Sequence, residues 1–180
     1  MPENRALPYL ALVLNALVWG VSWWPLRELQ GEGLHPLWSS AFTYLLGAVA
    51  MLCFMPQVWG EFVRHKALWL LALAAGITMV GFNWGVSIGE VIRVVLLFYL
   101  MPIWAVLLAR LILKEPITGR ALIRVALAFA GAVLLLSPNG TLGFPVPSNL
   151  AETLGLMGGA AFALNNILLR HQAERTAQAR

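Results

Sequence analysis

The sequence predicts an all-α integral membrane protein with about six transmembrane helices. Of its 180 residues, 60% are hydrophobic and only 11% are charged, whereas an average soluble domain carries about 25% charged residues. Apolar stretches of roughly 17–22 residues recur along the chain, and this length crosses a hydrocarbon layer about 30 Å thick. The basic residues separate these stretches instead of forming one patch, so the net charge of +4 does not indicate a nucleic-acid-binding surface.

Six stretches are expected to span the bilayer: residues 8–26, 37–55, 67–88, 94–113, 121–137 and 153–169. The first is longer than the apolar region of a signal peptide and lacks an A-x-A-like cleavage site, so we expect it to remain as a helix. Arg124 lies near the start of the fifth stretch, where its long side chain can extend to the membrane surface.

The distribution of Lys and Arg predicts the orientation of the helices. With the amino terminus inside, the outer segments contain only Arg27 and Arg93, and the other ten of the 12 basic residues lie inside. Positive residues concentrate on the cytoplasmic side of membrane proteins. We therefore expect a multi-pass protein of the cell (inner) membrane with both termini in the cytoplasm. The single cysteine, Cys53, excludes an intrachain disulfide.

The third stretch carries two different faces. Asn83, Ser87 and Glu90 are spaced at i, i+4 and i+7, which places them on one helical face. The second face carries small residues at intervals of four, which favour close helix packing: Gly81, Gly85 and Gly89. The polar face is expected to line a cavity; the alternative for each Asn and Ser is a hydrogen bond to a neighbouring helix.

Other stretches contribute further candidates. Asn15, Trp19 and Ser22 repeat the same spacing in the first stretch, and Ser40 shares a face with Tyr44 in the second. Pro102 predicts a kink in the fourth stretch and belongs with the packing residues. The expected substrate-binding residues are Trp19, Ser22, Tyr44, Asn83, Trp84, Ser87, Tyr99 and Asn165. Trp23 and Trp24 lie nearer the surface, where an interfacial aromatic belt is the simpler interpretation.

The sequence does not indicate an enzyme. It contains no Ser/His/acid set, phosphate-binding loop or cluster of metal ligands, so we expect no cofactor and no metal. No Asp, Glu, Lys or His lies in the middle of any predicted span. A cavity walled by aromatic rings and amides suits amphipathic organic solutes better than bare ions.

Several motifs resemble the EamA-type branch of the drug/metabolite transporter superfamily. They are Trp19-Gly20, the segment FYLMP at residues 98–102, LKEPIT at 113–118 and ALAFAGAVLLL at 126–136. The resemblance implies ten helices in two inverted five-helix repeats around a central cavity, and export of amino acids or other small metabolites. It makes residues 1–137 the first repeat, 138–152 an outer connection, and 153–180 the first helix and tail of an incomplete second repeat.

A weak internal similarity also bears on this interpretation. A shift of 143 positions sets Trp19 on Phe162, Ser22 on Asn165 and Arg27 on Arg170, a weak echo typical of an inverted repeat. The expected partners are a small-molecule substrate and the lipid bilayer. The alternatives are a short chain that forms a homodimer to complete the transport path, or a non-transporting membrane scaffold or assembly protein.

Overall fold

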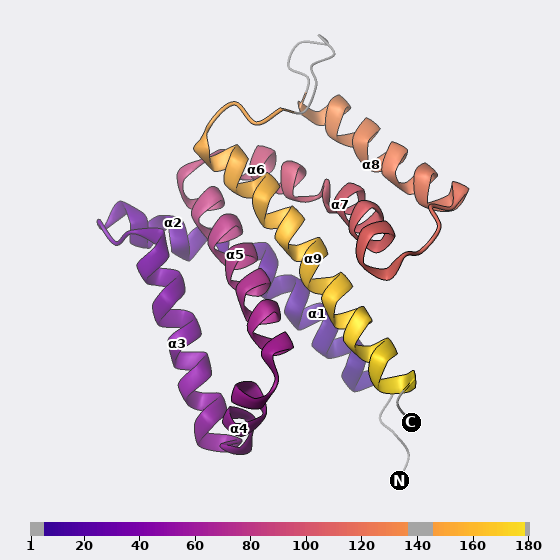
Figure 1. The fold of residues 1–180 in the computed structure, drawn as a ribbon. Helices are drawn as coiled ribbons and strands as arrows, with labels where there is room; N and C mark the ends of the chain where they lie inside the picture. The colour runs from indigo at the N-terminus through magenta and orange to yellow at the C-terminus, as the bar shows by residue number, and fades with distance from the viewer. Residues whose placement is uncertain (1–5, 137–145, 179–180) are drawn as a thin grey trace.

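The computed structural model describes residues 6–136 and 146–178, and every regular element in these ranges is a helix (Figure 1). The all-α prediction is confirmed. The helices are α1 (Ala6–Val21), α2 (Trp23–Gly31), α3 (Pro36–Phe54), α4 (Gln57–Arg64), α5 (Lys66–Ile88), α6 (Val91–Phe98), α7 (Met101–Leu108), the π-helix η1 (Ala109–Leu113), α8 (Gly119–Leu136) and α9 (Leu150–Gln178).

Four described stretches are long and apolar enough to cross a membrane: Pro8–Gly31, Pro36–Phe54, Lys66–Ile88 and Val91–Leu113. They correspond to the first four predicted spans. Helices α8 and α9 cover the fifth and sixth, and α9 extends beyond the predicted ends in both directions. Most of the connection predicted at 138–152 lies outside the described residues.

Two predicted spans are interrupted where a proline follows. The first breaks into α1 and α2 four residues before Pro25, and the fourth breaks into α6 and α7 four residues before Pro102. Proline lacks an N–H group and its ring clashes with the carbonyl four residues earlier, so the preceding turn cannot stay regular. The kink expected at Pro102 is therefore a two-residue turn, Tyr99-Leu100, between α6 and α7, whereas the interruption before Pro25 was not predicted.

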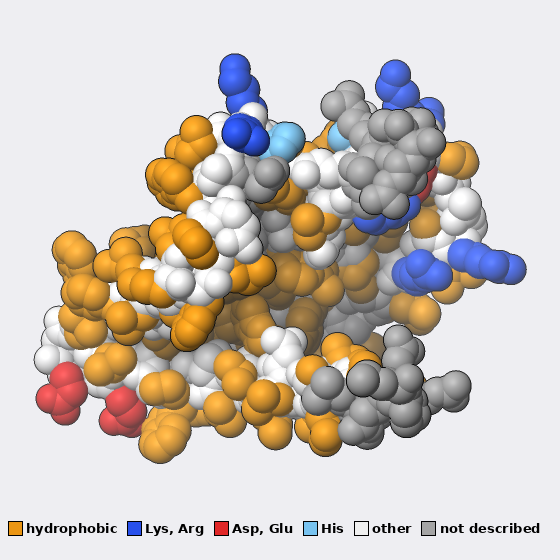
Figure 2. All heavy atoms as spheres, turned by 90° about the horizontal axis from the view of Figure 1, so that it is seen from below, with side chains coloured by type: hydrophobic (Ala, Val, Ile, Leu, Met, Phe, Trp, Pro, Cys, Tyr) orange, Lys and Arg blue, Asp and Glu red, His pale blue; other side chains and the backbone are white. Residues whose placement is uncertain are grey.

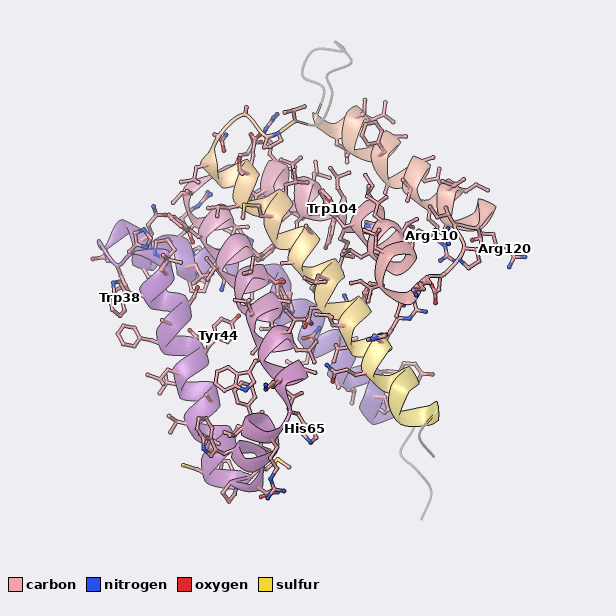
Figure 3. All side chains as sticks on the ribbon, in the orientation of Figure 1. Trp38, Tyr44, His65, Trp104, Arg110 and Arg120 are labelled. Carbon is pink, nitrogen blue, oxygen red and sulfur yellow. The ribbon has the colours of Figure 1, made fainter. Side chains whose placement is uncertain are left out.

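Helix α4 was also not predicted. It carries an aromatic group, in which the Phe62 ring lies 6.2 Å from the ring of Trp59 and 4.8 Å from that of Trp69 on α5. Arg64 lies in its last turn and His65 follows it, at the start of α5 (Figure 3). Aromatic rings beside basic residues on a short amphipathic helix are typical of the membrane surface.

Helix α9 lies along α5 and crosses α6 and α7 (Figure 1). Glycines on both helices allow their backbones to touch. A Cβ atom added to Gly81 would lie 2.7 Å from the Leu154 carbonyl oxygen, and one on Gly158 would lie 3.3 Å from the Phe82 amide nitrogen. The structure thus places the predicted stripe of Gly81, Gly85 and Gly89 against α9. Such close approach maximises dispersion contacts where no hydrophobic effect drives association.

Ion pairs connect α9 to the neighbouring segments near both of its ends. Arg93 Nε donates to Glu152 Oε1 at 2.7 Å, and the Glu152 side chain is only 4% exposed. Glu152 also accepts hydrogen bonds from the Ser148 amide and hydroxyl at 2.9 and 3.0 Å. The hydrogen bond from Arg93 is the main cause that lowers the Glu152 pKa to about 2. At the other end, Arg170 Nη2 lies 2.5 Å from Glu115 Oε1.

We predict that Gly81→Ala destabilises the protein by about 1–3 kcal/mol, because the new Cβ meets a backbone carbonyl of α9 that cannot move aside cheaply. The measurement is thermal unfolding in detergent, followed by tryptophan fluorescence. Gly76→Ala is the matched control on the same helix, since a Cβ there meets nothing within 4 Å. Equal melting temperatures for the two variants would contradict the proposed contact.

The lowered pKa of Glu152 predicts acid sensitivity at the start of α9. The ionised carboxylate stabilises the fold above its unfolded pKa of about 4.3, and this contribution is lost as the pH falls through about 2. Between pH 6 and pH 3 the melting temperature of the wild type should therefore fall more than that of Glu152→Gln, whose amide does not titrate. Glu32→Gln, in an exposed turn, is the control. Parallel pH profiles for wild type and Glu152→Gln would refute this assignment.

Candidate functional site

Two cavities meet at Trp19. The first, of about 570 Å³, lies between α1, α5, α6 and α9; we call it the aromatic cavity. The second, of about 590 Å³, lies between α1, α2, α3 and α5; we call it the polar cavity. Trp19 lines both. Figure 2 shows the molecule from below, with a hollow bordered mainly by hydrophobic side chains.

The aromatic cavity is walled by a chain of rings from four helices. The Phe82 ring lies 5.4 Å from the ring of Trp19 and 5.2 Å from that of Phe98, both edge to face. Phe98 in turn lies 5.7 Å from Phe162 of α9. These geometries are the ones that aromatic pairs prefer, and they fix the ring faces that border the cavity. Tyr99, on the same wall, is 58% exposed.

The polar cavity carries hydroxyl and amide groups on one wall. Asn83 Nδ2 donates to Ser40 Oγ at 3.1 Å, which joins α5 to α3, and Tyr44 lines the cavity beside them. Figure 3 shows Tyr44 on the side of α3 that faces α5. On the opposite wall, Ser22 donates to the Trp19 carbonyl at 3.0 Å, across the break between α1 and α2. The cavity therefore offers hydrogen bonds beside an apolar surface.

The predicted substrate-binding residues fall into two groups. Five of them line a cavity: Trp19, Ser22, Tyr44, Asn83 and Tyr99. The other three line neither: Trp84, Ser87 and Asn165.

Each of these three has a different environment. The Trp84 ring packs edge to face on His35 at 5.1 Å, and buried Ser87 donates to the Asn83 carbonyl at 2.7 Å. Asn165 is half-buried on α9. The polar stripe is also shorter than predicted, because α5 ends at Ile88 and Glu90 precedes α6 instead.

Several lining residues were not among the predicted substrate-binding residues. Phe82, Phe98 and Phe162 supply most of the aromatic wall, and Ser39 and Thr43 lie on the polar wall beside Ser40 and Tyr44. One sequence signal pointed to Phe162: the internal echo that pairs it with Trp19. Aromatic residues occur in every predicted span, so their type alone does not distinguish a cavity wall from ordinary packing.

These features define the class of the protein. It is a multi-pass membrane protein whose helices enclose uncharged cavities, and their volumes lie within the range of about 300–1,000 Å³ that holds small organic ligands.

The model of the EamA-like transporter family matches residues 6–137, which is most of the chain. The chain therefore belongs to the EamA-like transporter family, as its motifs suggested, and members of this family are membrane transporters of small molecules. Searches of curated proteins and of solved structures found no match.

The hydrogen bond between Asn83 and Ser40 predicts an energetic coupling between α5 and α3. Asn83→Ala and Ser40→Ala each leave a buried polar partner unsatisfied, so each should lower the free energy of unfolding by about 1–3 kcal/mol. The double variant should cost less than the sum, with a coupling of about 1 kcal/mol in a double-mutant cycle of thermal stability. Asn15→Ala, at an exposed residue, is the control. Strict additivity would show that the two side chains do not interact.

Proposed function

We propose that the protein is a secondary transporter that exports small organic metabolites, such as amino acids or amphipathic compounds, by alternating access. It acts in the cell membrane with both termini in the cytoplasm. Residues 1–137 form the first five-helix repeat, 138–152 the outer connection, and α9 opens the second repeat. The family match, which ends at residue 137, and the echo between α1 and α9 support this division.

The position of Trp19 carries the proposal. Among the described side chains of α1, every other residue is exposed and Trp19 alone is half-buried, so α1 meets the bundle chiefly through this ring. The ring lines both cavities and is the one residue that their linings share. Helices with few packed contacts move most easily. A rocking of α1 against the fixed α5–α9 pair would join or separate the cavities, which is what alternating access requires.

The cavity walls support an amphipathic substrate. Tyr99, Trp23 and the ring chain offer an apolar surface, while Asn83 and Tyr44 offer hydrogen bonds. Trp19, Ser22, Tyr44, Asn83 and Tyr99 are the residues that we propose contact substrate. Trp84, Ser87 and Asn165 would act through helix packing, and Asn165 would approach the pathway only in another conformation.

Transport tests this proposal directly. Purified protein in liposomes should accumulate a member of a panel of radiolabelled solutes that includes neutral amino acids and uncharged amphipathic amides, and protein-free liposomes should not. Trp19→Ala and Tyr99→Ala should each raise KM by roughly tenfold, because each removes an aromatic contact of about 1 kcal/mol or more. Trp38→Ala is the matched control, since Trp38 is 60% exposed and lines neither cavity (Figure 3). Unchanged transport by Trp19→Ala would remove Trp19 from the pathway.

A further inference from the structure

The Ser39 hydroxyl on the wall of the polar cavity has no hydrogen-bond partner within the described part of the chain. The residue is 5% exposed, and its Oγ atom is buried. A buried hydroxyl without a partner costs free energy that an alanine at the same position would avoid. Such a group therefore needs a partner in some other state of the protein.

The local backbone does not supply that partner in this structure. A helical serine usually donates to the carbonyl four residues earlier, which for Ser39 is that of His35. The His35 carbonyl already accepts the amides of Trp38 at 2.9 Å and of Ser39 itself at 3.4 Å. Because a carbonyl oxygen has two lone pairs, the His35 carbonyl cannot readily accept a third hydrogen bond from the Ser39 hydroxyl. The unsatisfied hydroxyl thus follows from the way α3 begins.

The neighbouring polar groups of the cavity are already engaged. Thr43 Oγ1 donates to the Ser39 carbonyl at 2.9 Å, Ser22 donates to the Trp19 carbonyl, and Ser40 accepts from Asn83. Ser39 differs from all of them because its hydroxyl has no hydrogen-bond partner in the described part of the chain. A group that enters the cavity would gain the most from this hydroxyl.

The charge of that group follows from the lining. Every residue that lines either cavity is uncharged. A cation or anion bound here would lose its hydration without a compensating charge, whereas a neutral amide or carbonyl would lose much less. The aromatic cavity, on the other side of Trp19, suits the apolar part of the same molecule.

We propose that Ser39 is the hydrogen-bonding anchor for the polar head of an uncharged amphipathic cargo, whose apolar body lies on the rings around Trp19. The anchor rests on the proposed transport function and specifies its substrate class. Rotation of the side chain about its Cα–Cβ bond turns the hydroxyl toward the cargo. The cargo then completes the hydrogen bond that the empty cavity lacks.

The test uses four ligands that share an indole body: indole-3-acetamide, tryptamine, indole-3-acetate and 3-methylindole. Each is titrated against the purified full chain in detergent, and the melting temperature is recorded. Indole-3-acetamide, the neutral amide, should stabilise the wild type most. Ser39→Ala should weaken the apparent affinity for indole-3-acetamide by roughly tenfold and leave the response to 3-methylindole unchanged.

The unliganded protein provides a readout that a merely structural role would not give. Ser39→Ala should keep or raise the melting temperature, because it removes a buried group without a partner. Thr78→Val is the matched control: Thr78 is 1% exposed, its hydroxyl donates to the Ala74 carbonyl at 2.8 Å, and it lines neither cavity. That variant should lower the melting temperature and retain the response to indole-3-acetamide.

Three results would overturn the anchor: no stabilisation by indole-3-acetamide, equal or stronger stabilisation by tryptamine or indole-3-acetate, or an undiminished amide response in Ser39→Ala. Its failure is distinguishable from that of the transport function. Uptake of tryptamine that needs Trp19 but not Ser39 would refute the anchor and leave transport intact. Binding of the amide through Ser39 without passage of any solute into liposomes would support the anchor and refute the transport function.

Discussion

The backbone contact between α5 and α9 is the constraint on which the rest of the structure depends. Glycines on both helices remove the side chains that would otherwise hold the two axes apart: a Cβ on Gly81 would lie only 2.7 Å from the Leu154 carbonyl oxygen. Two further glycines of α9, Gly155 and Gly159, lie equally close to α6, and along this side of α9 Phe162 meets Phe98 and Glu152 meets Arg93. The aromatic wall of one cavity and the Arg93–Glu152 ion pair at the end of the bundle thus both depend on the small residues that let α9 pack closely.

Helix α1 is packed much less closely than the α5–α9 pair. Helices α5 and α9 share a continuous seam, whereas α1 exposes every described side chain except Trp19. The interruption between α1 and α2 lies just before Pro25. In the proposed transport cycle, α1 would change its direction relative to α2 at this point, and the shared wall of the two cavities would move while the core that shapes their other walls stays packed.

Patterns within one helix could be predicted from the sequence, and pairings between helices could not. The apolar stretches, the stripe of Gly81, Gly85 and Gly89, and the disruption at Pro102 are local properties of one segment. The partner of Asn83 is Ser40, 43 positions away, and that of Arg93 is Glu152; no spacing rule connects them. Helix α4 was missed because eight residues are too few for a periodic signal. Ser39 was not selected as a binding residue because the lack of a partner for its hydroxyl cannot be seen in the sequence. It depends on the two backbone amides that the His35 carbonyl accepts.

The charged side chains are not part of either cavity lining, and there is a physical reason for this. The charged contacts that fasten α9 to α6 and to the segment after η1 involve Glu152 and Arg170, at opposite ends of α9, and Arg27 donates to the Val86 carbonyl near the end of α5. At the ends of the bundle each charge has a partner or water, so its desolvation cost is small. The residues that line the cavities between these ends are uncharged. A passage lined in this way can lose its water as a neutral molecule enters, because no ion of the protein is left without solvation.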